Sequence, residues 1–217
     1  MFKKLFSVWV MEDLLKQALK ESGEMLNETR QLFQAVLKAL TEKEEIDFDI
    51  YGEDRIINRY EINIRRKVLE HLSVSPRQDL TASLVLTSII IDIERIGDFS
   101  KNIYELARMF PEKFSGDYFS RLKEISGTVL ELFEHTCAAF SDADVKRAKI
   151  VTETHWKIAK ECDRIIADLL MDEKIAARRA VVAALCSRYL KRVSAHLMNI
   201  SSSVVNPFDR IGFRTAD

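Results

Sequence analysis

The segment LVLTSIIIDIERIGDFSKNIYELARMF, residues 84–110, decides the fold. Its apolar residues recur at helical spacing, which predicts one long helix with a core-facing side. Glu94, Asp98 and Asn102 follow at steps of four, so they lie along one stripe of that helix. Carboxylates beside a core-facing surface are costly unless a cation pairs with them or a metal ion binds them. The segment therefore predicts a helix that carries both core residues and a polar site.

The composition favours an all-α protein. The chain has 217 residues, of which 47% are hydrophobic and 31% charged, so it is globular rather than disordered. Six glycines and three prolines offer little turn chemistry for a many-stranded fold. The 33 basic and 34 acidic residues nearly cancel, and this balance gives no electrostatic argument for nucleic acid as a partner.

Cysteine usage and hydropathy indicate where the protein works. Cys137, Cys162 and Cys186 are odd in number and far apart, which favours a reducing, cytoplasmic compartment and small core residues. No apolar run reaches the 18 to 20 residues that a membrane helix needs. The basic start MFKKLFSVWV leads into a charged helical pattern without a small-residue cleavage site, so we expect no secretion signal.

The first ten residues carry apolar side chains that need a contact surface. Phe2, Leu5, Phe6 and Trp9 either cap a helical bundle, pack in a dimer, or rest on a membrane surface. Capping and dimer packing are the more common roles for such residues. We expect a homodimer, and contact with a membrane mainly through a partner.

Turn and cap residues divide the chain into six long helices. The predicted ranges are 11–40, 53–72, 77–110, 118–140, 145–171 and 173–205. Pro76, Pro111 and Pro207 all fall at predicted helix ends, and Ser141 to Asp144 offer N-cap residues. An acidic loop at 42–49 and Gly52 separate the first two helices, and the tail from residue 206 is expected to be irregular.

The six helices form two sets of three. DIERIGDFSKNI at 92–103 matches YLKRVSAHLMNI at 189–200, with Arg95 opposite Arg192 and Asn102 opposite Asn199. The offset of nearly a hundred residues indicates an internal duplication. Three helices joined by short links pack as an antiparallel bundle. We therefore predict two tandem three-helix bundles, residues 1–111 and 112–217.

The third helix of each set resembles the signature of the PhoU family of phosphate-signalling regulators. IIIDIERIGDFSKNI at 89–103 is similar to the family motif, and RVSAHLMNI at 192–200 resembles a second copy. The resemblance spans essentially the whole chain. It implies two three-helix bundles, no catalytic activity, and a regulatory role exercised with a phosphate transporter subunit and a sensor histidine kinase.

The resemblance also implies metal binding, because some family members hold multinuclear clusters through Glu/Asp-x-x-x-Asp motifs. The first repeat retains the motif, with hard oxygen ligands suited to divalent or iron ions at Glu94, Asp98, Asp54 and Asn58. The second repeat has Lys191, Ala195 and Lys157 at three of the corresponding positions and keeps only Glu153. Any metal is therefore expected on the first repeat alone.

Other interpretations stay open for the same residues. The carboxylates could instead pair with cations, for which Arg55, Arg59, Arg95 and Lys101 are candidates. Glu153, His155 and His196 could form a different site, although core contacts are more common for such histidines. We expect Asn102 and Asn199 each to bond a neighbouring helix end.

Two basic runs, around 55–67 and 174–192, are either solvated faces or docking surfaces for an acidic partner or anionic lipid. Lys191 and Arg192, where the metal motif is lost, and Arg95 are the predicted docking residues.

No catalytic motif is evident. The residues three before each histidine are Val68, Leu132, Thr152 and Val193, so the Glu-x-x-His pairs of di-iron enzymes are missing. The sequence also lacks a P-loop and the HExxH motif. A non-enzymatic regulator is the leading hypothesis, and a carboxylate-bound metal protein, either an enzyme or a storage protein, is the alternative.

Overall fold

The structure is a computed structural model that describes residues 2–74, 77 and 79–213, with side chains described from residue 14 onward. Within this part the chain is all-α and has no strand. The helices are α1 (Phe2–Thr41), α2 (Ile50–Val74), α3 (Leu80–Met109), α4 (Asp117–Asp142), α5 (Val145–Met171), α6 (Ala177–Ser202) and the short 3₁₀ helix η1 (Phe208–Arg210). Pro76 and the side chains of Phe2, Leu5, Phe6 and Trp9 lie outside the described part, so the roles expected for them stay predictions.

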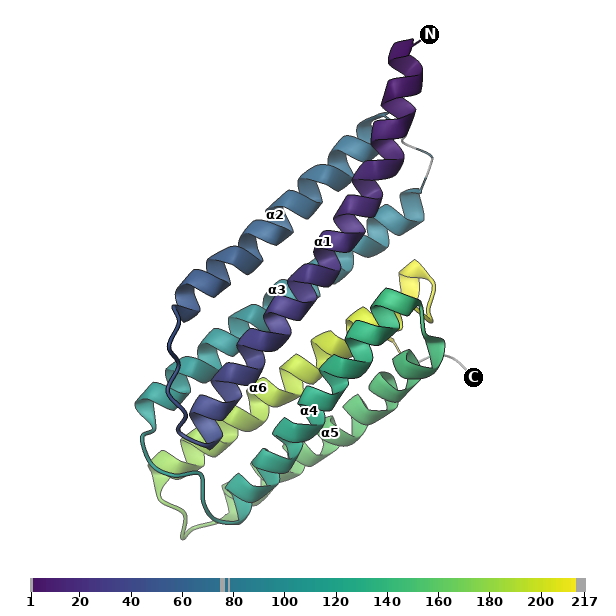
Figure 1. Ribbon diagram of the computed structural model, residues 1–217. Coiled ribbons are helices and arrows are strands. Elements are labelled where there is room, and N and C mark those ends of the chain that lie inside the picture. Colours follow the sequence, from purple (N-terminus) through teal and green to yellow (C-terminus); the bar gives the residue numbers. More distant parts are fainter. Residues whose placement is uncertain (1, 75–76, 78, 214–217) are drawn as a thin grey trace.

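The prediction of two tandem three-helix bundles is confirmed. Helix α2 runs antiparallel to α1 and α3, and α4, α5 and α6 repeat this up-down-up arrangement beside them (Figure 1). The first turns of α1 extend beyond the ends of α2 and α3 (Figure 1). None of the helices, over the residues described, is both long enough and apolar enough to cross a membrane.

The two bundles share a buried face. Helix α3 packs against α6, and α1 packs against α4. Phe33 of α1 and Phe133 of α4 are fully buried, and their ring centroids are 5.2 Å apart. A single continuous core therefore runs through both repeats.

Two arginines of α6 hold the end of α3 and the connection between the bundles, residues 110–116. Arg178 donates to the carbonyl of Met109 at 2.7 Å, and Arg179 pairs with Glu112 at 3.0 Å. The guanidinium of Arg179 also lies 4.5 Å from the ring centroid of Phe119. These two residues of the second basic run are thus engaged within the molecule rather than free on its surface.

The start of α2 differs from the prediction. The helix begins at Ile50 rather than at residue 53, because Asp49 accepts a hydrogen bond from the backbone N–H of Tyr51 at 3.1 Å. Gly52 therefore lies within the first turn of α2 and does not separate the first two helices. A Cβ atom on Gly52 would lie 2.9 Å from the Asp49 carboxylate, so glycine leaves room for the cap.

At other helix ends, local capping residues explain where the predicted bounds are correct and where they are not. Helix α5 has the predicted bounds because Asp144 accepts from the backbone N–H groups of Lys146 and Arg147. Helix α6 begins later than expected because Asp172 accepts from the backbone N–H of Lys174 at 2.9 Å and closes a turn first. The tail is less irregular than expected, since η1 lies within it.

Candidate functional site

Three of the predicted metal ligands meet where α2 packs against α3. Asp54 extends from α2, and Glu94 and Asp98 extend from α3, while Asn58 lies one turn after Asp54. The ammonium Nζ of Lys101 lies 3.0 Å from Asp54 Oδ2 and 3.1 Å from Asp98 Oδ1. We call Asp54, Glu94, Asp98 and Lys101 the acidic site.

The helices approach closely at this point because α3 carries a glycine there. A Cβ atom on Gly97 would lie 3.3 Å from the side chain of Ile57 on α2. This contact brings the carboxylate of α2 to those of α3. Asp54 is buried, and the side chains of Glu94 and Lys101 are 19% and 25% exposed.

The electrostatics of the acidic site reflect an excess of negative charge. Burial raises the pKa of Glu94, and the nearby Asp98 and Glu61 raise it further. Burial acts to lower the pKa of Lys101, but hydrogen bonds to Asp54 and Asp98 outweigh it, so that the pKa of Lys101 is raised. The ammonium is thus held in its charged form, and Glu94 is the carboxylate that it does not reach.

As arranged, these residues do not fit a multinuclear metal cluster. Lys101 takes oxygen atoms of both Asp54 and Asp98, and Arg95 Nε lies 3.8 Å from Glu94 Oε2. Among the residues that the structure describes, no three carboxylate, imidazole or thiol groups are placed to hold a metal ion. The sequence left pairing with a cation open, and Lys101 takes that role here. Metal binding by Glu94, Asp98, Asp54 and Asn58 itself stays a prediction.

In the second repeat a lysine again neutralises a carboxylate. Lys191, at the position of Glu94, lies 2.6 and 2.7 Å from the two carboxylate oxygens of Asp163 on α5. His155 is buried and its Nδ1 lies 3.0 Å from Ser194 Oγ. Burial, helped by the charge of Lys191, lowers the pKa of His155 to about 4, so the ring is neutral near pH 7. His155 thus makes a buried contact with Ser194 in the core of the second repeat.

A polar contact between the repeats is centred on Asp92, a residue that the sequence analysis did not single out. Asp92 Oδ1 on α3 accepts from His196 Nδ1 at 2.7 Å and from Asn199 Nδ2 at 2.9 Å, both on α6. The His196 ring also stacks on Phe99, with centroids 5.8 Å apart. The expectation that Asn199 bonds a helix end is wrong, because Asp92 lies in the middle of α3. The charge of Asp92 within the apolar run IIIDI was the one sequence signal that could have predicted this contact.

The predicted docking residues have different surroundings. The side chain of Arg95 is 59% exposed. Lys191 is held by Asp163, and the Arg192 guanidinium lies 6.0 Å from the ring centroid of Phe99 and 3.4 Å from His196 Nε2. Arg95 is thus more accessible than Lys191, whose side chain is 25% exposed.

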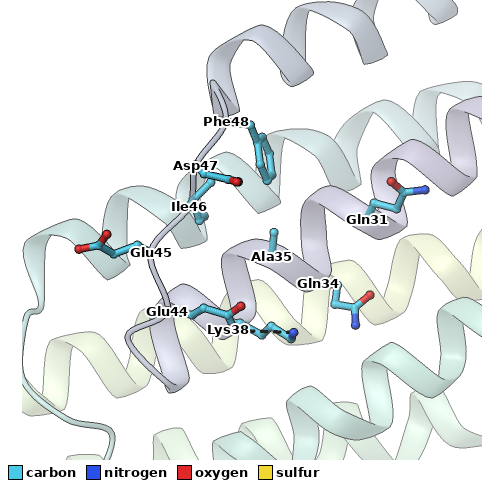
Figure 2. Close-up of a pocket in the computed structure, with 9 residues that line it drawn as sticks. All are labelled: Gln31, Gln34, Ala35, Lys38, Glu44, Glu45, Ile46, Asp47 and Phe48. Carbon is cyan, nitrogen blue, oxygen red and sulfur yellow. Dashed lines mark ion pairs between the residues drawn. The ribbon is translucent and has the colours of Figure 1, made fainter.

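A small hollow lies apart from the acidic site. It has a volume of about 300 Å³ and is enclosed by α1 and the acidic loop that follows it (Figure 2). Gln31, Gln34 and Lys38 of α1 line it, and Lys38 pairs with Glu44 of the loop at 3.6 Å (Figure 2). None of the predicted site residues lines it, so it adds nothing to their interpretation.

The fold and the acidic site define a tandem three-helix-bundle protein with its polar site on the first repeat. The chain belongs to the PhoU family, because the PhoU domain model matches residues 23–107 and again residues 122–204. The resemblance inferred from the two third-helix motifs is thereby confirmed.

Sequence relatives carry the same family name. The chain is 31% identical over 122 residues to "Phosphate-specific transport system accessory protein PhoU homolog 1" of Thermotoga maritima, a match covering 52% of this chain and 51% of the relative. The homologue of Aquifex aeolicus is 22% identical over 188 residues, covering 82% of this chain and 85% of that protein. The match with the T. maritima protein thus spans about half of that relative's length.

Solved structures have the same fold. PhoU from Pseudomonas aeruginosa superposes with a TM-score of 0.68 at 21% identity, over 91% of this chain and 95% of that one. The phosphate transport system regulatory protein PhoU from Streptococcus pneumoniae gives a TM-score of 0.67 at 16% identity, over 92% and 94% of the two chains. The six-helix tandem arrangement is therefore that of PhoU structures.

Proposed function

We propose that this chain is a non-enzymatic regulator of phosphate transport and phosphate-responsive signalling. It acts by docking to a membrane phosphate transporter subunit, to a sensor histidine kinase, or to both. The observation that carries the proposal is the match of the PhoU domain to both halves of the chain. The relatives' names, phosphate-specific transport system accessory proteins, support the link to transport.

Four acid–base candidates, His155, His196, Asp54 and Asp98, support a non-enzymatic role, because they serve as internal contacts. His155 bonds Ser194 in the core of the second repeat, and His196 bonds Asp92 between the repeats. The carboxylates Asp54 and Asp98 bond a lysine. A catalytic acid or base needs a free position beside a substrate, and these groups are occupied by the protein itself.

A docking mechanism requires an accessible face, and α2 offers one. Arg55, Arg59, Ile62, Arg66 and Leu69 are all exposed and follow at steps of three and four, so they share one side of the helix. We call these five residues the exposed α2 face. Ile62 and Leu69 are 55% and 67% exposed, which makes them apolar contact points between arginines.

The positive charge of the exposed α2 face indicates which kind of partner binds there. A second copy packed on this face would set arginine against arginine, so we assign it to a partner protein whose surface carries acidic residues around an apolar centre. Arg95 on α3 adds a further exposed cation near α2. Arginine is also the basic residue that contributes most often to protein interfaces, through planar, bidentate contacts with carboxylates.

The test is an affinity purification from detergent-solubilised cells grown with and without phosphate. The tagged chain should recover a phosphate transporter subunit or a sensor kinase, in amounts that change with phosphate supply. Arg59→Glu with Arg66→Glu should reduce recovery at least about tenfold, because reversed charges repel an acidic partner. Lys149→Glu with Lys160→Glu, on exposed positions of α5, is the matched control and should leave recovery unchanged.

Equal recovery of the partner with both double variants would show that the docking surface is not the exposed α2 face. Binding of the chain to anionic vesicles, with no protein partner recovered, would show that this face contacts lipid. Recovery of neither transporter nor kinase would contradict the proposed function. A cytoplasmic location and a homodimer belong to the same proposal, and light scattering of the purified chain measures the oligomer.

A further inference from the structure

We propose that Lys101 is a built-in counter-cation of the acidic site, so that this chain stabilises its first repeat with a lysine ammonium rather than a metal ion. The proposal concerns the chemistry of one site and does not depend on whether the chain regulates phosphate transport. Its consequence is a PhoU-family protein whose fold is independent of metal supply.

The geometry places one cation between two helices. Lys101 Nζ lies 3.0 Å from Asp54 of α2 and 3.1 Å from Asp98 of α3, so the ammonium joins the helices as a bridging ion would. Hydrogen bonds between charged groups at these distances are among the stronger polar contacts in proteins. Asp54 is buried, and a buried carboxylate needs such a partner.

A divalent ion would have to replace this arrangement. It would need the oxygen atoms of Asp54 and Asp98 that Lys101 now takes, and the displaced ammonium would stay nearby on the same helix. Repulsion between that charge and the ion would weaken binding. Glu94 alone remains outside the lysine contact, and one carboxylate falls short of the several oxygen ligands that such ions take.

The second repeat supports the proposal independently. There Lys191 stands at the position of Glu94 and holds both carboxylate oxygens of Asp163 at 2.6 and 2.7 Å. Ala195 stands at the position of Asp98. Each repeat thus pairs a carboxylate of its second helix with a lysine of its third helix, although Asp163 is 61% exposed and the two lysines occupy different positions in the third helix.

The experiment is a Mn²⁺ titration of the purified full chain, followed through the electron paramagnetic resonance signal of free Mn²⁺. The variant Lys101→Met keeps the length of the side chain but removes its charge. It should bind one Mn²⁺ at least about tenfold more tightly than the wild type, because the competing cation is gone. Adding Glu94→Gln and Asp98→Asn to that variant should abolish the gain.

Two controls isolate the charge. Lys101→Arg retains a cation and should bind Mn²⁺ as weakly as the wild type does. Lys160→Met removes an exposed lysine of α5 and should also leave binding unchanged. Should Lys101→Met unfold because Asp54 loses its partner, Lys101→Gln replaces it in the titration, since its amide can still donate to Asp54 but carries no charge.

Measurements on the wild type alone also test whether the fold depends on a metal ion. The thermal midpoint of the wild type should be the same with EDTA, with Mn²⁺ and with neither. Tight, stoichiometric Mn²⁺ binding by the wild type that is lost with Glu94→Gln would overturn the proposal. So would a folded Lys101→Met variant that binds Mn²⁺ no better than Lys160→Met.

Discussion

Asp92 illustrates how a single residue can organise two repeats. Its carboxylate accepts from His196 and Asn199 across the bundle interface, and the side chains of Asp92 and His196 are only 15% and 8% exposed. Because a carboxylate only accepts, His196 Nδ1 must carry the proton, which leaves Nε2 to face Arg192. The contact fixes the register of α3 against α6 through directional bonds, which apolar packing alone specifies less sharply.

At the same scale, His155 should make stability depend on pH. Its folded pKa is about 4, whereas an unfolded histidine titrates near 6.5. The unfolded chain therefore binds a proton first as the pH falls. The free energy of unfolding should be fully retained above pH 6.5 and should fall between pH 6.5 and 4, by at most about 1.4 kcal/mol per unit.

Urea unfolding at several pH values measures this effect, with His155→Gln as the comparison. The variant cannot titrate in this window, so the difference between the two proteins should shrink as the pH falls from 6.5 to 4. Parallel pH curves for the two proteins would show that burial of His155 contributes no pH dependence.

Residue-level prediction succeeded for the i, i+4 stripe and failed where partners come from elsewhere in the chain. The spacing of Glu94 and Asp98 correctly placed both on one side of α3, and Asp54 joined them from α2. Which cation would pair with them could not be deduced, since Lys101, Arg95, Arg55 and Arg59 were equivalent candidates. The folded structure pairs Arg55 locally with Asp49 before α2, and the packing of α2 on α3 brings Lys101 to the acidic site.

Helix ends follow local chemistry where a cap residue stands directly before the helix. Asp144 accepts from two backbone N–H groups at the start of α5, and the predicted bounds of that helix are correct. The start of α2 was misplaced because glycine usually ends a helix, whereas Gly52 gives space to the Asp49 cap. Local signals therefore predicted the existence of the six helices more reliably than the residue at which each helix begins.

The cap of α5 provides a prediction at the element scale. Asp144→Ala should lower the free energy of unfolding by about 1 kcal/mol, because two backbone N–H groups lose their acceptor. Asp142→Ala, two residues earlier at the C-terminal end of α4, is the matched control and should be neutral or slightly stabilising. Urea denaturation compares them, and an equal effect of both changes would argue against the cap.

Over the whole molecule, the shared core predicts that the two bundles unfold together. Phe33 and Phe133 join α1 to α4, Asp92 joins α3 to α6, and Arg179 fixes the connecting segment. The repeat organisation and antiparallel bundles could be predicted from the sequence because each third helix carries the same motif. The interface between the bundles could not, since apolar faces alone do not specify their partners.

Phe133→Ala tests the shared core. It should lower the free energy of unfolding by about 3 to 5 kcal/mol, since it leaves a cavity between the bundles. Phe48→Ala, at a partly exposed loop position, should change stability far less. Calorimetry of the wild type should give one transition, and two separate transitions would show that the bundles are independent units.

The most direct measurement of the central claim is the output of a phosphate-responsive reporter in cells that lack this chain. Loss of the chain should raise the reporter signal in phosphate-rich medium, and the wild-type chain should restore the low signal. Arg59→Glu with Arg66→Glu should fail to restore it, whereas Lys149→Glu with Lys160→Glu should succeed. An unchanged reporter signal in cells without the chain, with phosphate uptake also unchanged, would contradict a role in phosphate regulation.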